Sequence, residues 1–247
     1  MATIKKRKQT ESKRQQSSID PSFKLRSILP MTDGQKDVIE AYDEGHNLFL
    51  YGVAGTGKTF MSLYLALRDV MACKKNYHRV YIVRSSVPSR DMGFMPGTLQ
   101  EKMEVYEAPY RAMINKLFSR DDAWQIITAK GAVQLISTSY LRGITLENCV
   151  VIFDETQNAS FQEMDTVVTR IGDNCRIVLC GDIEQCDLLR KKNDITGFPA
   201  FAEIIKSMEE FRSVEFDIDA IVRSGIVKSY ILAKRRYQLS QHLPTFV

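Results

Sequence analysis

The sequence lacks the marks of membrane, secreted and metal-binding proteins. It has no run of about 18 apolar residues, and no apolar segment follows the basic residues near its N-terminus, so we expect neither a membrane span nor a secretory signal. Its five cysteines are odd in number and form no C-x-x-C pair, and its three histidines are scattered, which disfavours a disulfide framework and a zinc site. A cytoplasmic protein with buried or inert thiols is the expectation.

Net charge is also absent from most of the chain. The formal charge is +4, and residues 1–20 alone supply it, because six basic residues there face two acidic ones. A polar, basic arm of this kind cannot bury enough apolar surface to fold, so residues 1–24 are predicted to be a disordered tail and residues 25–247 a single domain. The tail either makes a weak electrostatic contact with nucleic acid or only adds solubility, since such charge runs are common.

Short apolar segments recur along the domain and predict its fold. Strands are expected at residues 47–51, 80–83, 132–138, 149–153, 176–180 and 213–216, with helical patterns between most of them. Several segments are continuous and rich in β-branched residues rather than alternating, which is typical of strands buried on both faces. The predicted fold class is therefore α/β, a doubly wound and mainly parallel sheet. No repeat with a period of about 20 to 50 residues is present, so one core is expected.

A glycine-rich stretch, GVAGTGKT at residues 52–59, follows the first predicted strand and opens a helix. It fits the pattern G-x-x-x-x-G-K-[ST] in the context that this pattern requires. Glycines let the backbone curl so that its N–H groups and the helix N-terminus point at phosphate oxygens. The residues expected to bind the phosphates of ATP are Gly52, Val53, Ala54, Gly55, Thr56, Gly57, Lys58 and Thr59. Within this set Lys58 would reach the β- and γ-phosphates, and the Thr59 hydroxyl would coordinate Mg²⁺.

Acidic and amide side chains follow two later strands. The apolar run VVIF places Asp154 at the end of a buried strand beside the phosphate loop, where it can hold Mg²⁺ through water. Glu155 comes next and is suited to orient or deprotonate an attacking water, which indicates hydrolysis. A further strand leads into GDIEQ, where the Gln185 amide can sense the γ-phosphate or its water. A turn that only caps the following segment is the alternative for Gln185.

An ordered series of motifs carries a resemblance to a known family. The series consists of TDGQ (32–35), GVAGTGKT (52–59), GFMPG (93–97) with Lys102 and Pro109-Tyr110 after it, LRGIT (141–145), DETQN (154–158), TRIG (169–172), GDIEQCDL (181–188) and IVRSGIV (221–227). In these segments the chain resembles the PhoH-like family, P-loop ATPases related to superfamily 1 helicase cores. The resemblance covers roughly residues 28–232 and leaves the basic tail outside it.

The resemblance implies a three-layer, RecA-like P-loop fold and ATP hydrolysis coupled to RNA or single-stranded DNA. It also implies that Gln35 reads the adenine and that Gln157 and Gln185 act as sensors. By the same resemblance, Arg223 or Arg142 faces the phosphates or a neighbouring subunit. From the residues alone, Gln35 could equally be a surface residue at a helix start, and the argument for Arg223 is the general need for a cation opposite the transferring phosphate.

Two segments depart from the usual pattern of this family. Arg84 is followed by serine instead of the usual proline, and the usual acidic stretch before GFMPG is missing, so whatever this loop binds is expected to differ. DETQN replaces the usual DEAQN but keeps Asp154, Glu155 and Gln157. The chain also leaves no room for the PIN-type ribonuclease domain of some relatives, and nuclease activity is not expected.

The sequence leaves the mechanism open between several alternatives. Helicase motors pair two domains, whereas one domain is expected in this chain. Either a neighbouring copy completes the site in a ring-like homo-oligomer such as a hexamer, or the ATPase is a slow switch. The ring-like homo-oligomer is the hypothesis that agrees with the family resemblance. A nucleic-acid binding module that uses ATP as a regulatory ligand, with negligible hydrolysis, is the alternative function. A small-molecule kinase is disfavoured because Glu155 and Gln185 favour an activated water over a bound acceptor.

Overall fold

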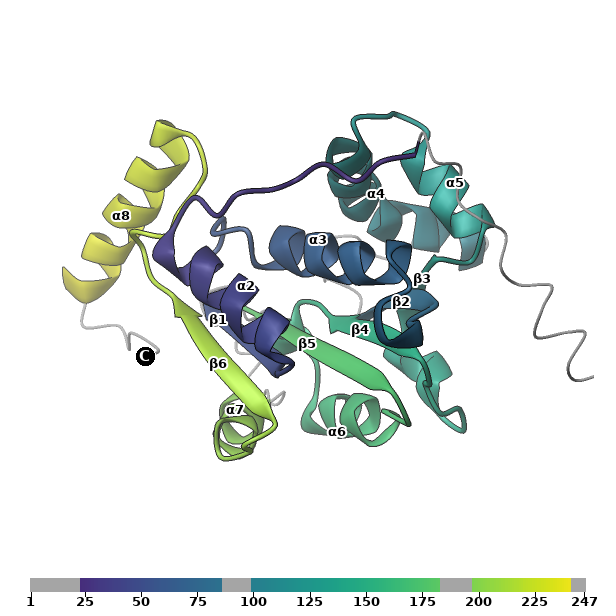
Figure 1. Cartoon of the computed structure of the whole chain (residues 1–247). Coiled ribbons are helices and arrows are strands. Elements are labelled where there is room, and N and C mark those ends of the chain that lie inside the picture. The colour runs from purple at the N-terminus through teal and green to yellow at the C-terminus, as the bar shows by residue number, and fades with distance from the viewer. Residues whose placement is uncertain (1–22, 86–98, 183–196, 241–247) are drawn as a thin grey trace, which may run out of the picture.

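Six strands form one parallel sheet in the computed structural model, which describes residues 23–85, 99–182 and 197–240, with the backbone alone for 99–105, 235, 238 and 239 (Figure 1). The strands are β1 (Asn47–Gly52), β2 (Arg79–Arg84), β3 (Val133–Ser137), β4 (Cys149–Phe153), β5 (Cys175–Gly181) and β6 (Phe211–Phe216). Their order across the sheet is β3-β2-β4-β5-β1-β6, and every neighbouring pair is parallel. The predicted α/β class is confirmed.

Helices cover both faces of this sheet (Figure 1). One face carries α2 (Asp33–Glu44), α3 (Lys58–Met71), α4 (Leu99–Phe118) and α5 (Ala123–Ala129), and the other carries α6 (Phe161–Thr169) and α7 (Phe198–Lys206). Short 3₁₀ helices η1 (Lys74–Asn76), η3 (Thr138–Leu141) and η4 (Thr156–Asn158) lie in the connections, and α8 (Gly225–Ser240) follows β6. Among the described residues, none of the helices has the length and apolarity needed to cross a membrane.

The strands contribute side chains to two separate apolar clusters, one on each face of the sheet. In β1, Leu48 and Leu50 pack with the helices α2 and α3, whereas Phe49 packs with α6 and α7. In β4, Ile152 and Val151 divide between the two clusters in the same way. This division follows from the alternation of side chains along a strand. Burial on both faces is the reason that these strands are continuous apolar runs.

The helix α2 has a typical capping residue at each end. The Thr32 hydroxyl accepts a hydrogen bond from the Gln35 backbone N–H at 3.3 Å, which caps the helix N-terminus. Gly45 ends the helix with φ of 107°, a left-handed conformation that glycine adopts at little cost. Val38 and Tyr42 are the buried apolar residues of its inner face. The helix therefore fixes Gln35 beside the sheet.

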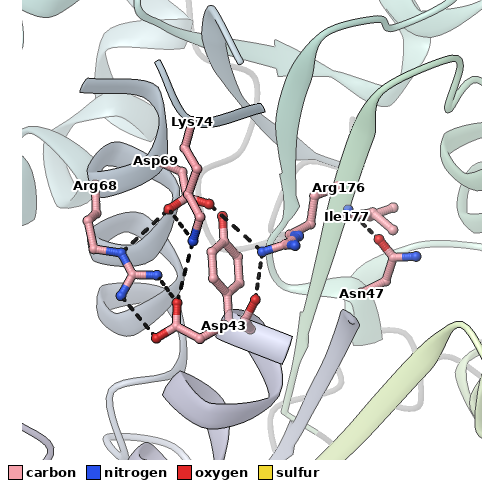
Figure 2. A network of polar contacts seen from close by, with 8 residues as sticks. Asp43, Asn47, Arg68, Asp69, Lys74, Arg176 and Ile177 are labelled. Atoms are coloured by element: carbon pink, nitrogen blue, oxygen red, sulfur yellow. Dashed lines mark hydrogen bonds and ion pairs between the residues drawn. The ribbon is translucent and has the colours of Figure 1, made fainter. Parts of the chain in front are cut away.

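A buried ionic network joins α3 to β5 at the edge of the sheet opposite to the phosphate loop (Figure 2). Asp69 is only 1% exposed and has Arg68 Nε at 3.5 Å, Lys74 Nζ at 3.7 Å and Arg176 Nη1 at 3.8 Å from its carboxylate oxygens. Asp43 shares Arg68 and Lys74 but is 45% exposed. Asp69 is thus the buried centre of this network, and Asp43 belongs to its solvated rim.

Arg176 is the buried cation of the same network. Its Nη1 donates to the Tyr42 backbone carbonyl at 2.8 Å, and its guanidinium lies 4.2 Å from the centre of the Tyr42 ring. A buried charge needs both an opposite charge and hydrogen-bond partners to be tolerated. Arg176 receives them from Asp69 and from α2, so the network ties two helices and a strand together.

The described chain begins at Phe23, inside the stretch predicted as tail. The Phe23 ring is buried and stacks on Phe118 of α4, with ring centroids 4.3 Å apart. Nearby, the Arg26 N–H donates to the Leu117 carbonyl at 2.9 Å. Residues 1–22, which hold six of the seven basic residues of the predicted tail, lie outside the described residues.

Candidate nucleotide-binding site

The carboxyl ends of the parallel strands meet at one edge of the sheet and bring the predicted site residues together. Beyond β1 lies the phosphate loop, beyond β4 lie Asp154 and Glu155, and Asp182 follows β5. β5 lies between β1 and β4. Ligands of open α/β sheets bind at this edge, so the fold places the loop and the acidic pair where their chemistry can combine.

The phosphate loop has the curled backbone that its glycines permit. Gly52, Gly55 and Gly57 all have positive φ, at 119°, 79° and 90°. A Cβ added to Gly52 would lie 2.1 Å from the Phe216 carbonyl oxygen, and the Val53 N–H donates to that same oxygen at 2.9 Å. Glycine is therefore required at position 52 both by backbone conformation and by the close approach of β6.

Lys58 is buried inside the curl of this loop. Its Nζ donates to the Gly52 carbonyl at 2.9 Å and to the Val53 carbonyl at 2.7 Å. Burial lowers the pKa of Lys58, and the negative charge of Asp182 opposes that effect. The ammonium is thus held at the centre of the loop, where phosphate oxygens would replace the two carbonyl acceptors.

Asp154 receives hydrogen bonds from two hydroxyl groups. The Thr59 hydroxyl donates to Oδ1 at 2.7 Å, and the Tyr110 hydroxyl donates to Oδ2 at 2.8 Å. Burial, and then the charge of Asp154, raise the pKa of Tyr110 well above its ordinary value, so the phenol stays a donor. The hydroxyl and carboxylate oxygens of Thr59 and Asp154 are the hard ligands that Mg²⁺ takes in proteins, so the donor set fits that ion.

Removing the Tyr110 hydroxyl is expected to destabilise the fold. In Tyr110→Phe, the buried Asp154 carboxylate loses a donor, and hydrogen bonds to charged groups contribute about 1.5–3 kcal/mol. The free energy of unfolding in urea should fall by that amount. Tyr140→Phe is the matched control because Tyr140 is 54% exposed. A loss no larger than that of the control would contradict a stabilising hydrogen bond to Asp154.

Gln157 links Glu155, which follows β4, to the backbone that follows β5 through two hydrogen bonds. Gln157 Nε2 donates to Glu155 Oε2 at 2.6 Å, and Gln157 Oε1 accepts from the Asp182 backbone N–H at 2.8 Å. Glu155 has φ of 55°, a left-handed backbone conformation that ends the extended path of β4. Burial and the neighbouring charge of Asp154 raise the pKa of Glu155. A carboxylate with a raised pKa is better matched to accepting a proton near neutral pH.

Gln35 and Arg223 contact the phosphate loop from outside it. Gln35 is buried; its Nε2 donates to the Thr56 carbonyl at 2.9 Å, and its Oε1 accepts from the Met31 N–H at 2.9 Å. Arg223 is exposed, and its Cγ lies 2.8 Å from the position of a Cβ added to Gly55. Both residues belong to the same chain as the loop, so the contact of Arg223 does not depend on a second copy.

Two predicted features lie outside the described part of the chain, and a third, Arg142, lies away from the phosphate loop. Gln185 and the GFMPG segment (93–97) lie outside the described residues. Arg142 is exposed and follows η3 and the edge strand β3, from which three strands separate β1.

Two site residues were missed or given no role by reasoning from the sequence. Tyr110 stood in a family motif, but nothing in its own neighbourhood indicated Asp154 as its partner. Arg84 ends β2, and its charge interacts with those of Asp154 and Glu155 across the edge of the sheet. The signal that could have found Arg84 is its position directly after the predicted strand at residues 80–83, just as Asp154 follows the predicted strand at 149–153.

The model of the family described as PhoH-like protein matches residues 27–234. The chain belongs to the PhoH-like family. A PhoH-like protein of Bacillus subtilis (strain 168) is 30% identical over 221 residues, which are 88% of this chain and 67% of that protein. Protein PhoH of Escherichia coli (strain K12) is 31% identical over 201 residues, 81% of this PhoH-like chain and 56% of its own length. The chain thus spans between about half and two thirds of these relatives.

Among solved structures, the large terminase of a thermophilic bacteriophage is similar to this PhoH-like chain, with 12% sequence identity and a TM-score of 0.47. The similarity covers 85% of this chain and 50% of the terminase chain. The family match and the phosphate loop together support a P-loop protein that binds ATP.

Proposed function

We propose that this PhoH-like chain is a Mg²⁺-dependent ATPase that acts on RNA or single-stranded DNA. The observation that carries the proposal is the hydrogen bond from Thr59 to Asp154. It joins the two expected metal ligands, one at the end of the phosphate loop and the other next to Glu155. Thr59 and Asp154 would hold Mg²⁺, which neutralises charge on phosphate oxygens when it is bound. Lys58 would exchange the Gly52 and Val53 carbonyls for oxygens of the β- and γ-phosphates.

Glu155 is proposed as the base that accepts a proton from the attacking water. The water oxygen forms a bond to the γ-phosphorus, the bond from that phosphorus to the oxygen of ADP breaks, and the proton of the water passes to a Glu155 oxygen. The hydrogen bond from Gln157 fixes the orientation of this carboxylate. Gln157 also contacts the backbone after β5, so it is proposed as a sensor that couples the state of the phosphate to β5. Gln185 is proposed as a second sensor, of the γ-phosphate or its water.

The proposed roles of Arg223, Arg142 and Gln35 follow from the positions of these residues relative to the phosphate loop. Arg223 stands against Gly55 of its own chain and would supply positive charge at the phosphates in cis. Arg142 is exposed beside the outermost strand β3, three strands away from β1. This position suits a contact with the site of a neighbouring copy in a ring-like homo-oligomer. Gln35 would read adenine only by exchanging one of its two present hydrogen bonds, and it otherwise supports the loop.

The nucleic-acid part of the proposal is supported by basic residues outside the site. Lys75 is exposed after α3, and Lys234 and Arg236 lie on α8. Lys74 is already paired with Asp43 and Asp69. A further run of basic residues, Arg190, Lys191 and Lys192, lies outside the described residues. Contacts of this kind neutralise phosphates and release counterions, so binding through them weakens steeply with salt.

Turnover of ATP should rise when single-stranded RNA or DNA is added. We expect a several-fold increase in phosphate release with Mg²⁺ at low salt, and we expect roughly half a molar of salt to abolish it because the phosphate contacts are screened. Measuring the rate per chain over a range of protein concentrations tests the shared site in the same assay, since a ring-like assembly makes that rate rise with concentration. Phosphate release that neither nucleic acid changes would contradict the nucleic-acid partner.

A further inference from the structure

Two cysteines start neighbouring strands at the edge of the sheet farthest from the phosphate loop. Cys149 is the first residue of β4 and Cys175 the first residue of β5, and the two are direct partners in the parallel register. Both side chains lie on the face covered by α6 and α7. Their sulfur atoms are 3.3 Å apart. Register, rather than spacing in the sequence, makes these two thiols neighbours.

The backbone at this pair has the dimensions that a disulfide requires. Neighbouring strands are about 4.8 Å apart, which lies within the span of about 4.4–6.8 Å seen between the Cα atoms of disulfide-bonded cysteines. Bonding of the Cys149 and Cys175 sulfurs needs them to approach from 3.3 Å to about 2.05 Å. Side-chain rotation and a small shift at the strand ends supply this movement, because each strand begins at its cysteine.

The two thiols differ in accessibility and in acidity. Cys149 is 1% exposed, whereas Cys175 is partly exposed at the surface of the sheet edge. The two sulfur atoms share a hydrogen bond in which either can be the donor, and this contact with Cys149 lowers the pKa of the Cys175 thiol to about 7. The thiolate is the reactive form of cysteine. Cys175 therefore has the properties of the attacking thiol and Cys149 those of the resolving thiol.

We propose that Cys149 and Cys175 form a disulfide when the protein meets a small organic disulfide, and that this bond is a redox modification site joining β4 to β5. The Cys175 thiolate attacks one sulfur of the organic disulfide, breaks its S–S bond, releases one thiolate and forms a mixed disulfide. The Cys149 thiol then loses its proton to solvent, attacks the Cys175 sulfur and releases the second small thiol. Two protein thiols are oxidised, and one organic disulfide is reduced to two thiols.

Peptide mapping of the full chain tests the linkage. The protein is incubated with increasing ratios of oxidised to reduced glutathione, quenched in acid, digested and analysed by mass spectrometry without reduction. We expect a peptide pair joined through Cys149 and Cys175, which dithiothreitol separates. Cys175→Ser should abolish it, and Cys73→Ser, which removes an exposed cysteine elsewhere, should leave it unchanged. Glutathione adducts without the joined pair, or no modification at all, would overturn the proposal.

Thermal melting shows whether the bond forms in the folded protein. Closing the chain between Cys149 and Cys175 restricts the unfolded state, and for a loop of this length we expect the oxidised protein to melt about 5–10 °C higher than the reduced protein. Dithiothreitol should reverse the shift, and Cys175→Ser should not show it. A joined peptide pair whose melting temperature equals that of the reduced protein would mean that the bond forms only in unfolded molecules, and would overturn a link between β4 and β5 in the native sheet.

Discussion

Phosphate release from ATP is expected to fall by about 10²- to 10⁴-fold in Glu155→Gln, the range that a positioned general base contributes. The substitution keeps the shape of the side chain and leaves an oxygen that can still accept from Gln157 Nε2. It removes only the ability to take a proton from water. Asp154 and Thr59 keep their hydrogen bond, so ATP and Mg²⁺ should bind to the variant as tightly as to the parent.

Two measurements separate the outcomes for Glu155→Gln. Phosphate release gives the rate, and titration with a fluorescent ATP analogue gives the affinity. Glu203→Gln is the matched control, because Glu203 is an exposed glutamate on α7 and should change neither quantity. Equal phosphate release from the Glu155→Gln variant and the parent would remove Glu155 from the chemistry. It would favour a nucleic-acid binding module in which ATP acts as a regulatory ligand.

The second large effect is expected far from the site, at the ionic network of Figure 2. Asp69→Ala removes the buried carboxylate that faces Arg176, whose side chain is only 4% exposed. Breaking a buried pair from one side leaves an uncompensated charge, at a cost of about 3–5 kcal/mol. The free energy of unfolding measured in urea should fall by that amount, with the slope of the denaturation curve unchanged.

The chain provides its own control for the Asp69 experiment. Asp43 pairs with Arg68 and Lys74 as Asp69 does, but it is 45% exposed, and exposed ion pairs contribute about 0.2–1 kcal/mol. Asp43→Ala should therefore cost much less than Asp69→Ala. Replacing both buried partners, in Asp69→Leu with Arg176→Met, should recover much of the loss because no unpaired charge remains. Equal losses for Asp43→Ala and Asp69→Ala would show that burial of the network does not determine its contribution.

The strands and the phosphate loop were predictable because their signals are local. A strand buried on both faces is apolar along its whole length, so a continuous apolar segment such as CVVIF at 149–153 predicts such a strand from sequence alone. The spacing of Gly52, Gly55 and Gly57 predicted the phosphate loop, and the positive φ values of these residues explain why glycine occupies those positions. Because parallel strands end at the same edge of a sheet, the position of Asp154 directly after a predicted strand was enough to place it at the edge that carries the loop.

The contacts that complete the site depend on packing and could not be read from spacing. Tyr110 reaches Asp154 across 44 positions, because α4 packs on the face that carries α3. Gln35 could be a surface residue by its position at a helix start, and only the approach of α2 to the loop buries it. Cys149 and Cys175 looked inert in the sequence, and the register of β4 and β5 makes them neighbours. The role of Gln185 stays a prediction.

The order of the strands has a consequence for how the protein is made. The partners of β1 are β5 and β6, and Tyr51 pairs with Glu215, 164 positions later in the chain. At a synthesis rate of about 5–20 residues per second, the ribosome needs about 8–33 s after β1 before that partner exists. Throughout this time the strand that leads into the phosphate loop lacks its full set of neighbours. The hydrogen bond from the Val53 N–H to the Phe216 carbonyl, which fixes the start of the phosphate loop, can therefore form only after β6 has been synthesised.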